Sequence, residues 1–393
     1  MKKKIYSIYQ KILYALTYLS ARLNSPFLFA SIYIIQLRKP REIKTKDKNK
    51  INLIILEKSG GTHDIINSLK NHKSKKNIFF SDRNFLKIIH DQFTNSATFK
   101  DFEKYDVKKE INNAKYMSFL NNFLNYMSKH FNNVEFMTFN FNYRPNFSLQ
   151  HACKRSDINY YVCLKECMST DGEFYIDHSV YRKYYKSFND ITKVSVYNYR
   201  TKNKLISNKL LDKNKIQVIG YPRLNINQKK IRKNNKLKIT FFLIDPLVGL
   251  GRIKGRTTHQ YHNKFLNTKF KKLFDWQIML DDTISTIKKL SIKYPNVEFV
   301  FKGKIGVHEE YLNKIKKDKY SNIKTFSGGV GTSFLESSDL IISFGSTVIF
   351  ESMVLKKNVL VPFYKKFRKN PFLKFVHKYP KTILADSRND LEN

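Results

Sequence analysis

One segment of the chain combines an apolar run with side chains suited to holding a phosphate. Residues 339–344 read DLIISF, and Gly345, Ser346 and Thr347 follow at once. We expect a strand followed by a helix that Ser346 caps, although serine is also the usual cap of any such unit. Because a helix start offers free N–H groups to anions, the segment predicts a diphosphate site, with Glu351 accepting a hydrogen bond from a ribose or sugar hydroxyl.

A second segment with phosphate-binding character follows another expected strand. Residues 245–258, DPLVGLGRIKGRTT, come after the apolar run 237–244 and place Arg252, Lys254 and Arg256 among three glycines. Cations on a flexible backbone suit phosphate oxygens. The pattern is not a Walker loop, and a mobile basic surface loop is the alternative.

A third candidate is a lysine at the end of a strand. Lys302 ends the apolar run 297–302 and precedes Gly303 and Lys304. An ammonium group in this position would reach donor phosphates and offset charge on a leaving group. A solvated basic turn is the alternative.

The first half of the chain carries candidate groups for an acceptor. His63 follows a glycine turn after an apolar run, and its ordinary pKa suits proton transfer near neutrality. Glu166 follows another expected strand and is a rival base, while Lys165 beside it would pair with an anionic acceptor. Arg223 closes an expected interdomain hinge, where its role is expected to be mainly structural, and it is a further candidate to reach a phosphate. A structural role is the alternative for each of them.

No metal site and no organic cofactor are expected from the sequence. Asp281 and Asp282 lie inside a long expected helix as a solvated pair, not in an Asp-x-Asp motif. Cys163 and Cys167 have no second Cys or His pair at zinc-ligand spacing, so buried thiols are expected. Signatures of serine hydrolases, zinc proteases and cysteine nucleophiles are absent as well.

Apolar runs and amphipathic segments alternate along both halves of the chain, which implies parallel strand–helix–strand units. We therefore expect an α/β protein with two Rossmann-like domains that face each other across a cleft, and with an N-terminal helical extension. The expected divisions are residues 1–50 for amphipathic helices and a basic linker, 51–223 for the first domain, 224–236 for a polar linker and 237–393 for the second domain.

The composition favours anionic partners. The chain has 73 Lys and Arg against 32 Asp and Glu, a formal charge of 73 − 32 = +41. Such a charge attracts phosphorylated substrates, an anionic membrane face or nucleic acid, although usage of AT-rich codons explains part of it. Nucleic acid is the least favoured partner, because no binding module is recognised and the aromatic side chains fall mostly in expected core elements.

The N-terminus does not fit a signal peptide, because no small-residue cleavage site follows a compact apolar core. It does not fit a membrane span either, because Arg22, Asn24 and Pro26 interrupt its apolar stretch. Two amphipathic helices, over residues 5–23 and 26–37, are expected instead. Lysines at the start, several tyrosines and a basic end suit a helix lying on an anionic membrane surface. A helical pair packed on the protein itself is the equal alternative.

Three segments resemble known enzymes. Residues 339–364 resemble the donor-binding end of GT-B glycosyltransferases. Residues 218–223, VIGYPR, resemble the G-x-P-R that closes the first domain in a bacterial surface-carbohydrate family related to CDP-glycerol glycerophosphotransferases and capsule transferases. Residues 161–170, YVCLKECMST, resemble a strand followed by Lys-Glu in that family. Residues 301–304, FKGK, depart from its Lys-x-His-Pro pattern.

The resemblance implies a metal-independent glycosyltransferase. It would move a sugar, or a glycerol-phosphate-like group, from a nucleotide-sugar or CDP-activated donor to a surface polysaccharide or lipid-linked acceptor. The donor would be a substrate held by the second domain, and the enzyme would be cytoplasmic and peripheral at the inner face of the cell membrane. A nucleotide-sugar 2-epimerase shares the two-domain plan and stays open, as does a non-catalytic nucleic-acid-binding protein.

Overall fold

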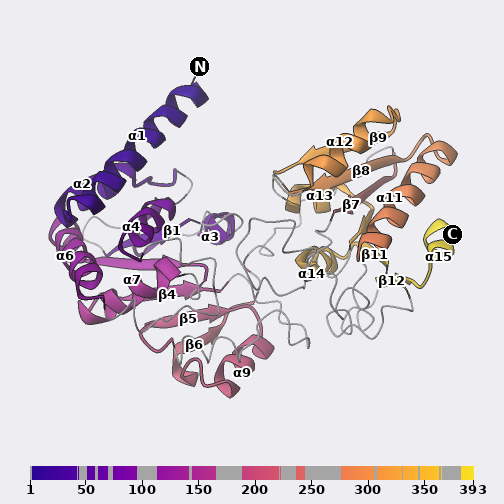
Figure 1. Ribbon diagram of the computed structural model, residues 1–393. Coiled ribbons are helices and arrows are strands. Elements are labelled where there is room, and N and C mark those ends of the chain that lie inside the picture. Colours follow the sequence, from indigo (N-terminus) through magenta and orange to yellow (C-terminus); the bar gives the residue numbers. More distant parts are fainter. Residues whose placement is uncertain are drawn as a thin grey trace. The chain divides into compact units, whose positions relative to one another are not determined.

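The computed structural model describes sixteen stretches of the chain, which form two compact units, one up to residue 222 and one from residue 236 onward (Figure 1). Each unit contains one six-stranded sheet whose strands all run parallel, which confirms the expected α/β class with two Rossmann-like sheets. The described residues are 2–41, 43, 51–57, 61–69, 74–94, 113–140, 144–164, 188–220, 222, 236–243, 276–304, 308–329, 331–343, 346–362, 364 and 382–393.

The first sheet has the strand order β2-β1-β3-β4-β5-β6. Its strands are β1 (Asn52–Leu56), β2 (Asn77–Ser81), β3 (Val134–Thr138), β4 (Tyr160–Cys163), β5 (Lys193–Val196) and β6 (Ile216–Val218). Every residue of β1 is buried, as a central parallel strand requires, and this burial explains its four consecutive apolar residues, 53–56.

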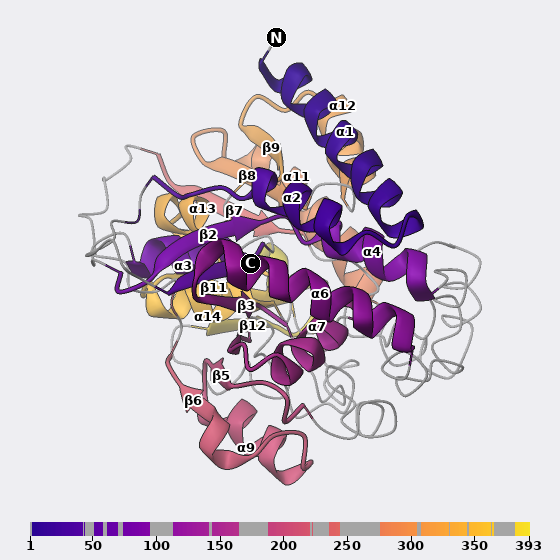
Figure 2. The same ribbon diagram turned by 90° about the vertical axis from the view of Figure 1, so that its left-hand side faces the viewer.

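Helices cover the first sheet. They are α3 (Gly61–Leu69), α4 (Asn84–Thr94), α6 (Ala114–Phe131), α7 (Arg144–Arg155), α9 (Tyr199–Ser207) and the short η3 (Lys213–Lys215). Helices α4, α6 and α7 pack against one another, and Figure 2 shows them side by side. Asn113 starts α6 by accepting a hydrogen bond from the Tyr116 N–H group at 3.1 Å.

Two N-terminal helices, α1 (Lys2–Arg22) and α2 (Pro26–Gln36), belong to the first unit. Helix α2 is integral to its core, where Phe29 and Tyr33 are fully buried, so the alternative of packing on the protein is correct for α2. Arg38 then forms an antiparallel bridge with Phe80, which covers the edge strand β2. None of the described helices is long and apolar enough to span a membrane.

The second sheet has the order β12-β11-β10-β7-β8-β9. Its strands are β7 (Lys238–Phe242), β8 (Glu298–Gly303), β9 (Ile323–Ser327), β10 (Leu340–Ile342), β11 (Asn358–Pro362) and β12 (Thr382–Ala385). Its helices are α11 (Trp276–Lys293), α12 (Glu309–Lys317), α13 (Gly331–Ser337), α14 (Thr347–Val354) and α15 (Arg388–Glu392). Phe241 and Phe242 alternate between two separate apolar clusters, as neighbouring residues of a strand covered on both faces must.

The end of the second unit corrects one expectation. Asp282 was expected to be solvated, but its carboxylate accepts a hydrogen bond from the Tyr364 hydroxyl at 3.1 Å and lies 3.7 Å from Arg388. Arg388 belongs to α15, which Ser387 caps by accepting from the Asp390 N–H group. The aspartate therefore helps to hold the last helix on α11.

Candidate functional site

The second sheet reverses its strand order beside its central strand, β7. One side of β7 pairs with β8, where Phe242 lies opposite Lys302, and the other pairs with β10, where Phe241 lies opposite Ile342. Counted within this unit, the strand order is the 3-2-1-4-5-6 of classic dinucleotide-binding sheets, in which ligands bind outside the carboxyl ends of the strands at the reversal point. The carboxyl ends of β7, β8 and β10 therefore define the candidate site.

The turn from β10 into α14 forms one part of this site. The Ser346 backbone is extended, and its hydroxyl accepts a hydrogen bond from the Val348 N–H group at 3.4 Å, so Ser346 is the helix cap that the sequence predicts. Glu351, on the same helix, is only 2% exposed. Gly345 and the side chain of Thr347 lie outside the described part of the chain.

Lys302 contributes a buried cation at the end of β8. The residue is 7% exposed, so the alternative of a solvated turn is wrong for this lysine. Its ammonium group donates a hydrogen bond to the Gly303 carbonyl at 2.8 Å and lies 5.4 Å from the ring centre of Phe334. No carboxylate of the described residues forms an ion pair with it. Burial, together with repulsion from Lys304, lowers the pKa of Lys302.

A glycine and a histidine shape the backbone next to Lys302. A Cβ atom at Gly303 would lie 2.9 Å from both the Cβ of His308 and the Cδ1 of Leu312. His308 is fully buried, and its Nδ1 accepts a hydrogen bond from the Lys304 N–H group at 3.0 Å, so a neutral ring carries its proton on Nε2. The sequence offered only a weak signal for this residue, a histidine four positions after Lys304 at the start of an expected helix.

The basic loop of the predicted site follows β7, at the reversal point. Arg252, Lys254 and Arg256 all lie outside the described residues. The structure thus fixes which strand the loop leaves and leaves its contacts with phosphate a prediction.

The acceptor-side residues belong to the first unit. His63 is exposed on the first turn of α3, and Glu166, Lys165 and Arg223 lie outside the described residues. The roles predicted for these four side chains therefore stay predictions.

The buried residue beside His63 was not predicted. Asp64 is 1% exposed and accepts a hydrogen bond from the Tyr197 hydroxyl at 3.2 Å. A Cβ atom at Gly61 would lie 2.5 Å from the ring of Phe139, so glycine is required where α3 starts. These contacts fix α3, and with it His63, at the carboxyl end of β1.

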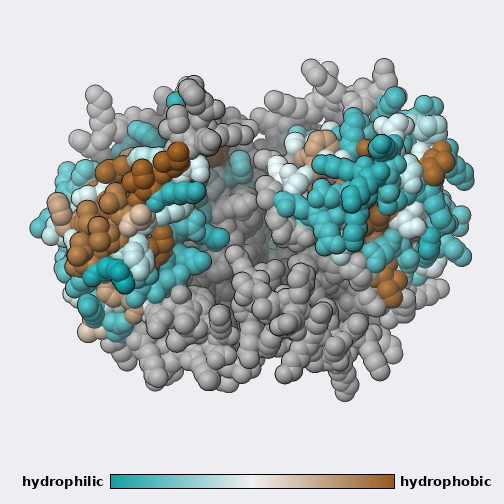
Figure 3. Space-filling model, turned by 45° about the horizontal axis from the view of Figure 1, so that its top comes forward, coloured by the Kyte–Doolittle hydropathy of each residue, from teal (hydrophilic) through white to brown (hydrophobic). Residues whose placement is uncertain are grey.

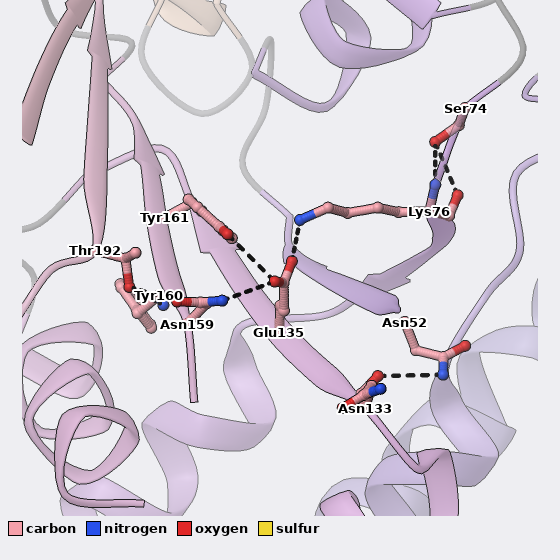
Figure 4. Close-up of polar contacts among 9 residues, drawn as sticks. All are labelled: Asn52, Ser74, Lys76, Asn133, Glu135, Asn159, Tyr160, Tyr161 and Thr192. Carbon is pink, nitrogen blue, oxygen red and sulfur yellow. Dashed lines mark hydrogen bonds and ion pairs between the residues drawn. The ribbon is translucent and has the colours of Figure 1, made fainter. Parts of the chain in front are cut away.

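A polar cluster lies at the opposite, amino edge of the first sheet. Figure 4 shows the buried carboxylate of Glu135 between Lys76, Tyr161 and Asn159. Lys76 forms an ion pair with it, Asn159 donates at 2.9 Å and Tyr161 donates at 3.2 Å. Burial and the nearby Glu135 raise the pKa of Tyr161, and Lys76 partly opposes this shift. The groups satisfy one another across three strands, which is the signature of a structural anchor.

The thiols are buried, as expected, where the structure describes them. Cys153 and Cys163 are 0% and 3% exposed, and burial raises the pKa of Cys163 to about 12. Cys167 lies outside the described residues. Within the described stretches, no group of three or more His, Cys, Asp and Glu side chains is placed to hold a metal ion.

No protein-family model matches this sequence, and no curated protein matches it. The chain is similar in structure to UDP-GlcNAc 2-epimerase from Neisseria meningitidis bound to UDP-GlcNAc, with 13% identity over 87% of this chain and 89% of that one and a TM-score of 0.46. S. aureus MnaA, in a co-structure with UDP, is 9% identical over 88% of this chain and 86% of that one, with a TM-score of 0.48. A UDP-forming trehalose-phosphate synthase from Burkholderia xenovorans is 8% identical over 88% of this chain and 89% of that one, with a TM-score of 0.43. At these TM-scores the similarity does not indicate an activity, and the function is inferred from the residues of this chain.

Proposed function

We propose that this chain is a transferase that moves a sugar, or a glycerol-phosphate-like group, from a nucleotide-activated donor to a surface glycan or lipid-linked acceptor. One observation carries the proposal. The three segments with phosphate-binding character lie at or after the carboxyl ends of β7, β8 and β10, the three neighbouring strands at the reversal point of the second sheet. Because these strands lie in sequence far from one another, their convergence supports a single anion site.

The residues at this edge suit the departure of a phosphate group. In sugar transfer, the acceptor oxygen forms a bond to the anomeric carbon while the bond from that carbon to the donor diphosphate breaks, and the diphosphate leaves with the electron pair. The growing negative charge would be stabilised by the ammonium group of Lys302 and by the positive end of the α14 helix dipole. The buried Glu351 would accept a hydrogen bond from a ribose or sugar hydroxyl.

Further roles complete the proposal. Arg252, Lys254 and Arg256 would contact the donor phosphates, with the backbone at Gly345 and the Thr347 hydroxyl beside Ser346. His63 or Glu166 would take the proton of the acceptor hydroxyl, which none of the donor-site cations can accept. Lys165 and Arg223 would pair with anionic groups of the substrates.

Many aromatic side chains that could stack on nucleic-acid bases are instead buried in the two cores. The largest fully buried side chains of the described residues are all tyrosines and phenylalanines, including Tyr160 in the first unit and Phe241 in the second. These rings build the cores and are not available to stack on bases.

The first test is a thermal-shift screen of the purified protein with CDP, UDP, CMP, UMP, GDP and a DNA oligomer. A nucleotide at 100 times its dissociation constant should stabilise the protein by about 2.7 kcal/mol. We expect one nucleotide to raise Tm and the variant with Ser346→Ala and Thr347→Ala to lose that rise. Ser387→Ala is the matched control, because Ser387 caps α15 in the same way but lies at the end of the chain. A rise with DNA alone would overturn the proposal.

A second test separates transfer from epimerisation. The nucleotide sugar that matches the stabilising nucleotide is incubated with the protein, with and without an acceptor. A transferase releases the nucleotide and forms a glycoside only when the acceptor is present. Conversion of the free nucleotide sugar into its C2 epimer would replace the transferase proposal by a 2-epimerase.

A further inference from the structure

Helix α1 contacts the first unit with only one of its faces. Leu13, Thr17, Ser20 and Ala21 are buried against the protein, where α1 packs on α2 and α4. The Tyr14 hydroxyl adds a hydrogen bond to Asp82. The helix is therefore fixed to the unit along this face, and the rest of its circumference is open.

A second face of α1 is apolar and exposed. We call it the α1 outer face, and it consists of Ile8, Ile12, Leu16, Leu19 and Leu23, which are between 38% and 63% exposed. Their spacing of four, four, three and four residues places them in one stripe along the helix.

The apolar stripe continues beyond α1. Phe27, at the start of α2, is 60% exposed, and its ring lies 5.2 Å from the ring of Tyr126 on α6. Figure 3 shows the resulting hydrophobic band, in brown, along one side of the first unit. A monomeric soluble protein rarely exposes a contiguous patch of this kind without a partner.

The charges around the band have a single sign. Residues 1–41 contain eight Lys and Arg and no Asp or Glu, and α6 contains no acidic residue either. Lys11 and Arg22 are exposed, and helical geometry puts both beside the apolar stripe. Arg22 also lies 5.3 Å from the ring centre of the exposed Tyr18. The band is thus flanked by cations and by amphipathic aromatic rings.

We infer that the α1 outer face docks the protein on an anionic membrane surface, with the apolar stripe entering the interface and Lys11 and Arg22 lying among the lipid headgroups. Apolar side chains in one stripe, cations beside it and tyrosines at the boundary are what an interfacial helix requires. The inference goes beyond the proposed function and stands on different residues.

Charge decides between a membrane and a second copy of this chain. In a twofold contact through this face, both copies would bring α1 and α6, which carry basic and no acidic residues, so like charges would oppose association. Nucleic acid would satisfy the cations but has no hydrocarbon to receive five large aliphatic side chains. An anionic lipid surface satisfies both parts of the band at once.

The anchoring of α2 makes the docking face a rigid one. The Gln36 side chain donates to the Ser81 hydroxyl at 2.8 Å and accepts from the Asp82 N–H group at 3.1 Å, and both contacts are buried or partly buried. Since α1 packs on α2, a membrane that holds α1 would also hold the first unit close to its surface. An acceptor carried by a lipid would then be delivered to that unit.

The test is co-sedimentation of the full chain with vesicles of phosphatidylcholine alone and of phosphatidylcholine with phosphatidylglycerol. The wild type should sediment with the anionic vesicles, and added salt should weaken this binding. Replacing Ile12, Leu16 and Leu19 together by glutamine leaves the net charge unchanged, and glutamine has a helix propensity high enough to keep α1 helical. This variant should bind the anionic vesicles at least about tenfold more weakly than the wild type, because its apolar stripe is lost.

Two controls make the result specific. Ile292→Gln changes an isoleucine of α11 that is 69% exposed in the second unit, and it should sediment like the wild type. Lys11→Gln with Arg22→Gln should lose much of the preference for anionic vesicles, whereas Lys316→Gln with Lys317→Gln on α12 should keep it.

Three outcomes would overturn the inference. The first is that the wild type stays in solution with both kinds of vesicle. The second is that the triple glutamine variant binds as tightly as the wild type, because binding would then be due to the bulk charge of +41. A dimer in light scattering that the triple variant converts to a monomer would make the band a contact between copies. Nucleotide stabilisation, measured without vesicles, reports on the proposed function separately.

Discussion

Glu135 and Lys302 are both buried charges at the end of a strand, but they lie at opposite edges of their sheets. Glu135, at the amino edge of the first sheet, is bonded to Lys76, Asn159 and Tyr161. Lys302, at the carboxyl edge of the second sheet, has a backbone carbonyl and an aromatic ring near its ammonium group, and no carboxylate among the described residues. The first charge is neutralised inside the protein, and the second is not neutralised by any carboxylate that the structure describes.

This difference separates structural polar groups from those available to a ligand. Burying a charge without an opposite charge costs free energy, which a bound anion would recover. At the amino edge of the second sheet, a charged side chain is again neutralised by partners within the protein, because Glu298 pairs there with Lys238 and Lys324. Substitutions at amino edges should therefore change stability alone, and substitutions at the carboxyl edge of the second sheet should change the binding of nucleotides.

Glu135→Ala should have the largest effect on stability. It leaves the ammonium group of Lys76 and two other buried or half-buried donors without their acceptor, which should lower the free energy of unfolding by about 3 kcal/mol. Urea unfolding measures this change. Glu310→Ala is the control, because its ion pair with Lys314 is exposed to solvent and should contribute little to stability. If Glu135→Ala left stability intact but removed nucleotide stabilisation, the division between the edges would be wrong.

Gly303→Ala should follow, at the carboxyl edge. The added methyl group would press against His308 and Leu312 at 2.9 Å, so we expect a loss of about 2 kcal/mol in stability together with weaker nucleotide binding, since Lys302 is the neighbouring residue. At Gly331, the first residue of α13, the same methyl group meets only Phe242 at 3.8 Å. Gly331→Ala should be neutral or slightly stabilising, and equal losses in the two variants would contradict the steric argument.

Lys302→Met and Lys357→Met compare two lysines whose pKa burial lowers. The ammonium group of Lys357 donates to the carbonyls of Glu336 and Ser338, so Lys357→Met should cost about 1–2 kcal/mol in stability and keep nucleotide binding. Lys302→Met should keep stability and weaken nucleotide binding about tenfold, because a charge-assisted bond is worth roughly 1.5–3 kcal/mol. Calorimetric titration with the stabilising nucleotide measures the difference, and the reverse result would assign the anion site to the wrong lysine.

The sequence predicts the strands better than the polar contacts between them. The strand expected within residues 339–344 and the Ser346 cap of the helix that follows were predicted correctly, because burial and helix capping depend on neighbouring residues. Asp282 was expected to be solvated. Its contacts with Tyr364 and Arg388 could not be predicted, because these partners come from segments far along the chain. The same reason hides the burial of Lys302, since its exposure depends on how β7, β9 and α13 close around β8. The short helix α15 (RNDLE) also lacks an apolar run, and it is ordered by packing on α11.

Glu298 provides the smallest effect and a test by pH. Partial burial tends to raise the pKa of Glu298, but hydrogen bonds and ion pairs with Lys324 and Lys238 outweigh it, so that the pKa lies below its ordinary value of 4.5. A carboxyl whose pKa is lower in the folded state stabilises the protein above the unfolded-state pKa, and this contribution disappears as the pH falls through the folded-state pKa.

Glu298→Gln should therefore lower stability at pH 7 by less than about 1 kcal/mol, because solvent screens the exposed part of the pair. The difference between wild type and variant in urea midpoint should shrink once the pH falls below 4.5. A difference that stays constant from neutral to acid pH would show that the pair at this amino edge is held by packing and not by charge, unlike the pair at Glu135.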